Sequence, residues 1–155
     1  MMVVQRYAEN TAVSVSSSQA EIEHILTRYG ATGFLRGWDN EKAFLAFSVN
    51  DRQVRFVLPL PAKSEFRYTH HRYPRPRSPT GIEEAWEQAC RQRWRALALV
   101  VKAKLEAVQA GISTFEQEFL ANIMLPNGQL VGQWMQPQIA TAYETGSMPP
   151  LLPTG

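Results

Sequence analysis

The amino-acid sequence predicts an α+β protein in which a strand, a helix and a three-stranded antiparallel sheet precede a mostly helical C-terminal half. Residues 33–60 contain three apolar-polar runs separated by turn-forming residues, as half-buried strands do. Residues 81–110 repeat apolar side chains every three or four positions, as a long amphipathic helix does. A chain of 155 residues, of which 45% are hydrophobic, is long enough for one domain with a sizeable core.

The first 30 residues predict a short strand and then a helix. Residues 11–15 alternate as a strand would. Ser18 and Glu21 have the spacing of a capping box, in which two side chains bind the free N–H groups at a helix start. Gly30 is expected just past the helix, because glycine adopts the left-handed backbone of a helix end at little cost. The apolar stripe between these ends consists of Ile22, Ile25, Leu26 and Tyr29.

The three strands expected within residues 33–60 are joined by short turns. Asn50 and Asp51 form the second turn, since both residues tolerate the positive φ that a two-residue turn demands. Pro59 and Pro61 end the sheet. The resulting register pairs Val49 with Arg52, Phe47 with Val54 and Leu45 with Phe56. This register gathers the large apolar side chains on one face of the sheet.

The helical half is expected to be built on one helix over residues 81–110. Thr80 and Glu83 have capping-box spacing at its start, and Gly111 follows its end. Its main apolar arc consists of Trp86, Cys90, Trp94, Leu97, Val101, Leu105 and Val108. Leu99 and Val100 lie off this arc, so the helix forms the centre of the core or carries a second interface. We expect Trp38, Trp86, Trp94 and Trp134 to be core or interface anchors.

Shorter elements are expected after residue 111. A helix covers residues 114–120, an Asn127-Gly128 turn joins a small hairpin, and a last helix covers residues 132–144, with Pro137 limiting its first part. The tail is extended. We divide the chain into a small α+β unit (1–60), a connector (61–80) and the helical half (81–155), which together form one compact domain.

The connector, residues 61–80, has the most unusual composition in the chain. Four of its twenty residues are proline, and no apolar period is visible, so we expect no regular element there. Its cations are Lys63, Arg67, Arg72, Arg75 and Arg77, and they alternate with Phe66, Tyr68, His70, His71 and Tyr73. Glu65 is the only acidic residue among them.

Several classes of function find no support in the sequence. The single Cys90 excludes a disulfide framework and a thiolate metal cluster within one chain. The longest apolar run covers residues 96–101, whereas a membrane span needs about 20 residues. The chain contains no phosphate-binding glycine motif, and His70 and His71 are adjacent, which suits zinc poorly. We therefore expect a soluble cytoplasmic protein that is not an enzyme and that uses no cofactor, metal or membrane.

Three segments carry a resemblance to a known family: residues 86–108 (WEQACRQRWRALALVVKAKLEAV), residues 115–120 (FEQEFL) and residues 149–153 (PPLLP). They resemble a family of small proteins, of no known activity, that recurs in tailed phages and prophages. The first segment is the most specific of the three. The resemblance implies a viral setting in the cytoplasm of a host cell, where replication, recombination and counter-defence are common roles. It brings no catalytic residue and no ligand.

The leading hypothesis is a non-catalytic accessory protein that binds nucleic acid, most of all single-stranded DNA. Cations neutralise phosphates, and planar side chains stack on unpaired bases. The long helix adds cations that lie close together, on the side that we expect to be opposite the apolar arc. The candidate binding residues are Lys63, Phe66, Arg67, Tyr68, Arg72, Tyr73, Arg75, Arg77, Arg91, Arg95 and Lys102. If the connector folds back along the helix, the two groups form one basic groove.

Two other interpretations remain open at this stage. The connector and the helix cations are also typical of ordinary solvated surfaces. The apolar middle of the long helix and the tail from Met148 to Pro153 favour an oligomeric module, or a regulator that binds a phage or host protein. The charge pattern supports an acidic partner for the first part of the chain. Residues 1–104 hold all 16 basic and 10 of the 14 acidic residues, whereas residues 105–155 hold only acidic ones.

Overall fold

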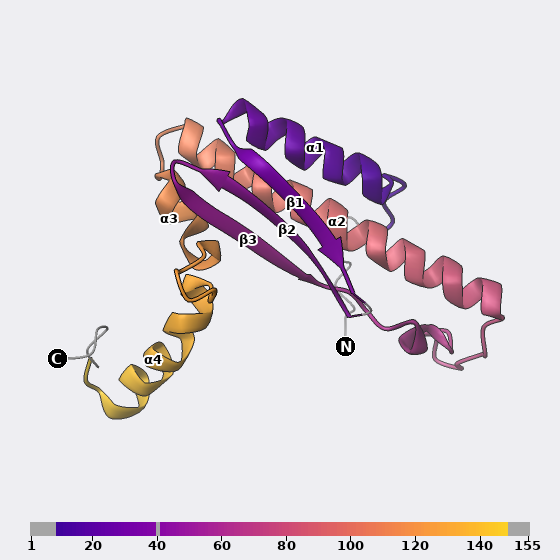
Figure 1. The fold of residues 1–155 in the computed structure, drawn as a ribbon. Helices are drawn as coiled ribbons and strands as arrows, with labels where there is room; N and C mark the ends of the chain where they lie inside the picture. The colour runs from indigo at the N-terminus through magenta and orange to yellow at the C-terminus, as the bar shows by residue number, and fades with distance from the viewer. Residues whose placement is uncertain (1–8, 40, 149–155) are drawn as a thin grey trace.

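The computed structural model describes residues 9–39 and 41–148 and confirms the α+β class. The elements in chain order are α1 (Val15–Arg28), β1 (Thr32–Trp38), β2 (Lys42–Val49), β3 (Arg52–Pro59), η1 (Lys63–Phe66), α2 (Pro79–Gln109), α3 (Phe115–Phe119), η2 (Leu120–Asn122) and α4 (Val131–Thr145). Figure 1 shows α1 and α2 side by side along the sheet, whereas α4 projects away from one end of it.

The sheet has the strand order β1-β2-β3 and is antiparallel throughout, as the sequence predicts. Asn50 and Asp51 form the β2–β3 turn with φ values of 50° and 62°. The observed pairs Val49 with Arg52, Phe47 with Val54 and Leu45 with Phe56 match the predicted register. This agreement follows because a one-residue slip would turn every apolar side chain of a strand to the opposite face.

The first helix begins earlier than the sequence indicated, and the strand expected at residues 11–15 is wrong. Ser14 is the N-cap, and its side chain accepts a hydrogen bond from the backbone N–H of Ser17. Ser18 lies inside α1 and is completely buried. Several serines in this stretch are able to cap a helix. The earlier start adds a turn that packs Val15 against the core, which explains why Ser14 rather than Ser18 is the cap.

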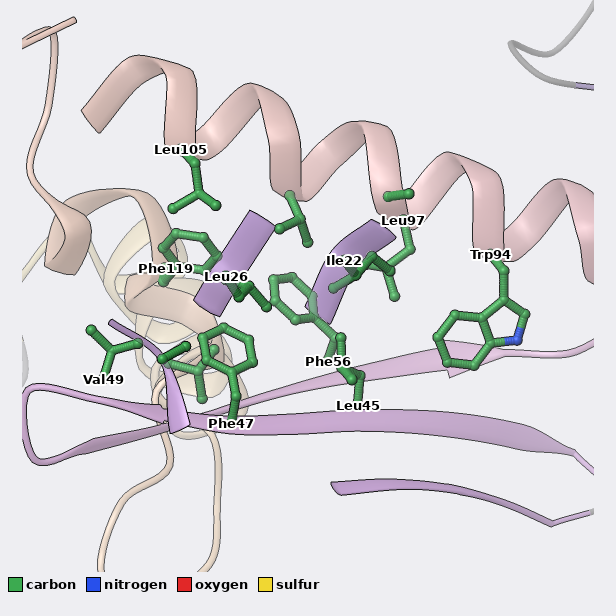
Figure 2. Close-up of a cluster of buried hydrophobic side chains, with 14 of the residues drawn as sticks. Ile22, Leu26, Leu45, Phe47, Val49, Phe56, Trp94, Leu97, Leu105 and Phe119 are labelled. Atoms are coloured by element: carbon green, nitrogen blue, oxygen red, sulfur yellow. The ribbon is translucent and has the colours of Figure 1, made fainter. Parts of the chain in front are cut away.

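The core lies between one face of the sheet and the two long helices. Buried side chains of β2 and β3 meet Ile22 and Leu26 of α1 and the buried face of α2. Phe119 of α3 closes one end, with its ring edge-on to Phe47 and Phe56. Figure 2 shows the phenylalanine cluster near one end of this layer, with Trp94 set apart at the other end.

The long helix α2 also begins slightly earlier than predicted. Ser78 is its N-cap, and its side chain accepts from the N–H of Gly81, so Thr80 does not start the helix. Pro79 takes the first helical position, where its missing N–H costs nothing. The buried residues of α2 are Cys90, Trp94, Leu97, Ala98, Val101 and Leu105. The first eleven residues of the helix therefore contribute no buried side chain to the core.

The C-terminal part is close to its prediction. Thr114 caps α3, and the turn at Asn127-Gly128 is present, with Met124 bridged to Leu130. Ile123 pairs with Val54 and so extends the sheet beside β3. Pro137 does not divide α4, which is one continuous helix, and this corrects our expectation. Of the tail expected to dock on a neighbour, residues 149–153 lie outside the described residues.

The β2–β3 turn gives a direct test of the backbone strain at Asp51. Asp51→Gly is expected to unfold at higher urea concentration than Asp51→Ala, with a difference of about 1 kcal/mol in the free energy of unfolding. Glycine adopts the left-handed φ freely, whereas alanine adopts it at a cost. Equal stability of the two variants would contradict the turn geometry.

Candidate nucleic-acid interface

The connector is an ordered loop, and our expectation that it contains no regular element is wrong. It opens with η1, and residues 67–77 then fold back on themselves. The N–H of Arg77 donates to the carbonyl of Arg67 at 2.8 Å, and the N–H of Thr69 donates to the carbonyl of Arg75 at 2.9 Å. These bonds close a hairpin-like turn without long strands. We call residues 63–77 the connector loop.

Arg77 stabilises the connector loop from within. Its guanidinium donates from Nη1 to the carbonyl oxygens of Phe66 at 3.2 Å and Tyr68 at 2.8 Å. The side chains of Arg77 and Phe66 are only half exposed. The guanidinium therefore links the two arms of the loop.

Lys63 and Trp86 attach the connector loop to α2. Lys63 Nζ lies 2.8 Å from a carboxylate oxygen of Glu83 and 4.6 Å from the centre of the Trp86 ring. The indole N–H of Trp86 donates to the carbonyl of Pro61 at 2.9 Å. The charge of Lys63 is thus already paired, and the base of the loop is fixed to the first turns of the helix.

Five predicted binding residues remain exposed on the connector loop: Arg67, Tyr68, Arg72, Tyr73 and Arg75. No ion pair occupies their guanidinium groups among the residues that the structure describes. Arg72 lies 5.8 Å from the ring centre of Tyr73, which is 76% exposed. These five side chains form a basic and aromatic surface on a fixed backbone.

We expected the cations of α2 to share one solvent-exposed face opposite the core, and they do not. α1 packs along that flank of α2, and Arg95 forms an ion pair there with Glu21 of α1. Lys102 lies near the C-terminal end of α1, about 16 Å along the helix axis from Arg91. The helical period alone cannot tell which flank of a helix receives a second helix, and this is why the prediction failed.

A cavity of about 700 Å³ lies where α1, α2 and the ends of β1 and β2 meet. The sequence gives no sign of this cavity, because its walls come from segments that are far apart in the chain. Its lining residues are Ser14, Val15, Ser16, Gln19, Arg36, Gly37, Trp38, Ala43, Leu60, Trp86, Glu87, Cys90, Arg91 and Trp94. Arg91 is the only α2 cation among the predicted binding residues that reaches it.

Two arginines in the cavity wall are held by neutral partners. Arg36 Nη1 donates to Gln19 Oε1 at 2.8 Å. Arg91 donates from Nε and Nη2 to Gln88 Oε1 at 3.0 and 2.6 Å. Because a glutamine orients a guanidinium without neutralising it, both positive charges stay available. Among the described residues that line the cavity, Glu87 is the one acidic side chain.

Tryptophans supply the aromatic part of the cavity wall. Trp94 is 4% exposed and belongs to the core, as predicted. Trp86 is half buried, whereas Trp38 at the end of β1 is 82% exposed and is not a core residue. The proximity of Trp38 to the turn after β1 was the only sequence signal that this side chain would lie at an edge. Trp134, in α4, is half buried and lies outside the lining.

Comparison with known proteins adds no assignment. No protein-family model, curated protein or solved structure matches the chain. Within the described residues, no group of three or more His, Cys, Asp and Glu side chains is placed to hold a metal ion. None of the described helices has the length and apolar character that a membrane span requires.

Cys90 is expected to be a slow nucleophile in the folded protein. It is 7% exposed, and burial raises the pKa of its thiol, so little thiolate forms near neutral pH. We expect dithiobis(nitrobenzoic acid) to react with it at least about tenfold more slowly in the folded protein than in urea. The control is Thr141→Cys in a Cys90→Ser background, since residue 141 is exposed. Equal rates for the two folded proteins would contradict the burial of Cys90.

Proposed function

We propose that this protein binds single-stranded nucleic acid, with single-stranded DNA as the favoured ligand, and acts without catalysis in replication or recombination. The phage-type cytoplasmic setting belongs to the same proposal. The observation that carries it is the exposed set Arg67, Tyr68, Arg72, Tyr73 and Arg75 on the ordered connector loop. This set combines cations and planar side chains on one short segment.

The backbone of the connector loop is suited to ligand binding. Internal hydrogen bonds and the guanidinium of Arg77 hold the loop in one form before a ligand arrives. Binding then costs less conformational entropy than it would for a flexible segment. Arginines bind phosphates through paired N–H donors, and each tyrosine that stacks on a base contributes about 1–3 kcal/mol. Single strands fit better than duplexes, because stacking requires unpaired bases.

The first functional prediction concerns the charge of the connector loop. The triple variant Arg67→Gln, Arg72→Gln and Arg75→Gln should bind a labelled strand of about 30 nucleotides at least about tenfold more weakly than the wild type at about 50 mM salt. Because three phosphate contacts are lost, the negative slope of log K against log salt should become shallower by about 2. Fluorescence anisotropy at several salt concentrations measures both quantities.

A matched control removes three cations from the opposite end of the molecule. Arg28→Gln, Arg52→Gln and Lys102→Gln lower the net charge by the same amount. Arg28 and Lys102 line a separate pocket near the C-terminal end of α1, and Arg52 follows the β2–β3 turn. The sequence made Lys102 a candidate binding residue, but this position, about 16 Å along α2 from Arg91, takes it out of the proposed binding surface. This variant should keep the salt slope of the wild type. Equal losses in both triple variants would show that net charge, rather than the connector loop, drives binding.

A second candidate function, self-association, is favoured by α4. No residue of this 15-residue helix is buried, and Ile139 and Tyr143 are 48% and 88% exposed. Val131 at its start packs against the core, but a helix of this length is only marginally stable in water without further packing partners. Its only charged side chain is Glu144, so two copies meet with little repulsion. We propose that α4 pairs with α4 of a second copy of this chain, in the symmetric way that is common for dimers.

The variant Ile139→Glu with Tyr143→Glu tests this pairing. Light scattering after size-exclusion chromatography should give a dimer for the wild type and a monomer for the variant, because two buried carboxylates per chain oppose association. Thr141→Glu adds one charge on the other side of α4 and should remain dimeric. A monomeric wild type at high micromolar concentration would overturn this second candidate.

A further inference from the structure

The cavity beside the connector loop combines the two chemistries that a nucleotide requires. Arg36 and Arg91 offer positive charge that neutral glutamines orient, and Trp38 and Trp86 offer indole surfaces. Its volume of about 700 Å³ lies within the range of about 300–1,000 Å³ that is usual for small-molecule sites. It is also linked to the base of the connector loop, because Trp86 both lines the cavity and donates its indole N–H to the carbonyl of Pro61.

We infer that this cavity binds one nucleotide, with its phosphate at Arg36 and Arg91 and its base against the tryptophans. The ligand that we favour is the 5′-phosphorylated end of a nucleic-acid strand whose following nucleotides cross the connector loop. For this ligand the inference rests on the proposed function. A free nucleotide offers the same chemistry, and the experiment below separates the two sources.

The charges favour a terminal phosphate over an internal one. A terminal phosphate carries a charge of about −2 near neutral pH, whereas each internal phosphate carries one negative charge. Two arginines without carboxylate partners among the described residues match a charge of −2. Arg91 uses Nε and Nη2 on Gln88, and its Nη1, which has no hydrogen bond to any described residue, can donate to a phosphate oxygen.

The other lining residues suit the base and the sugar. Ala43, Leu60 and Val15 add apolar surface to the indoles of Trp38 and Trp86. Indole rings provide flat surfaces on which any base stacks. The carboxylate of Glu87 repels a phosphate placed beside it, but it accepts hydrogen bonds from the exocyclic amine that adenine and cytosine carry. We therefore choose deoxyadenosine monophosphate as the probe.

The experiment measures three ligands on the full-length wild type: deoxyadenosine monophosphate, and one strand of about 30 nucleotides with and without a 5′-phosphate. The mononucleotide should quench tryptophan fluorescence and slow the reaction of Cys90, which also lines the cavity. The phosphorylated strand should bind about tenfold more tightly than the unphosphorylated one.

Variants locate the effect in the cavity. Trp38→Ala and the double variant Arg36→Gln with Arg91→Gln should lose both the response to the mononucleotide and the preference for the phosphorylated strand. Arg28→Gln, at the opposite end of α1 from the cavity lining, should keep both. Circular dichroism checks that each variant is folded. The connector-loop triple variant should weaken both strands equally and leave the mononucleotide response unchanged.

Each outcome separates this inference from the proposed function. If both strands bind equally and the mononucleotide gives no response, the cavity is not a nucleotide site, although strand binding stands. If the mononucleotide binds but neither strand does, the proposed function fails and the cavity takes a free nucleotide. If the mononucleotide binds and both strands bind equally, the cavity takes a free nucleotide and the strand-end source is overturned.

Discussion

The packing of one long helix on a shorter sheet determines the rest of this structure. Helix α2 has 31 residues and is about 46 Å long, whereas an eight-residue strand spans about 27 Å. The core contacts of α2 end at Cys90, and its N-terminal turns extend beyond them. This overhang supports the base of the connector loop through Lys63 and Trp86. The cavity lies where this overhang begins, because Trp86, Cys90 and Trp94 of α2 all line it.

The second helix decides which cations stay available. α1 packs along one flank of α2 and pairs Glu21 with Arg95, so that this charge stabilises the helix pair. At the N-terminal end of α1 the neighbouring side chains are glutamine and serine, and Arg36 and Arg91 keep their charges. The helix pair thus neutralises Arg95 near its middle, whereas Arg91 of α2 and Arg36 of β1 have neutral partners near the N-terminal end of α1. Whether an arginine is paired with a carboxylate therefore depends on its position along α1 and not on the composition of the sequence.

The parts of the fold that depend on local patterns could be predicted from the sequence. The register at Phe47 and Val54 follows from side-chain alternation and the Asn50-Asp51 turn, and both are local properties. The choice of Ser14 over Ser18 as a cap depends on packing against the core, and a pattern of adjacent serines cannot reveal it. The sequence did not predict that the connector loop is ordered. Hydrogen bonds from the Arg77 side chain to backbone carbonyls hold the loop, and such bonds leave no apolar repeat in the sequence. The cavity escaped prediction for a similar reason, since no single segment contains it.

The distribution of charge, rather than the net charge, decides where an anionic ligand is attracted to the molecule. Residues 105–155 hold four glutamates and no cation, and Glu116 is paired with Arg52 at the end of the molecule that lies opposite the connector loop. The same end also holds Arg28 and Lys102, so the preference for the connector loop rests on the loop arginines, which have no ion-pair partner among the described residues and attract a polyanion. Close contacts within a Debye length of about 10 Å at about 0.1 M salt retain this preference in ordinary buffers. A near-neutral total charge is therefore compatible with binding at one end, because binding depends on the local field and not on the sum.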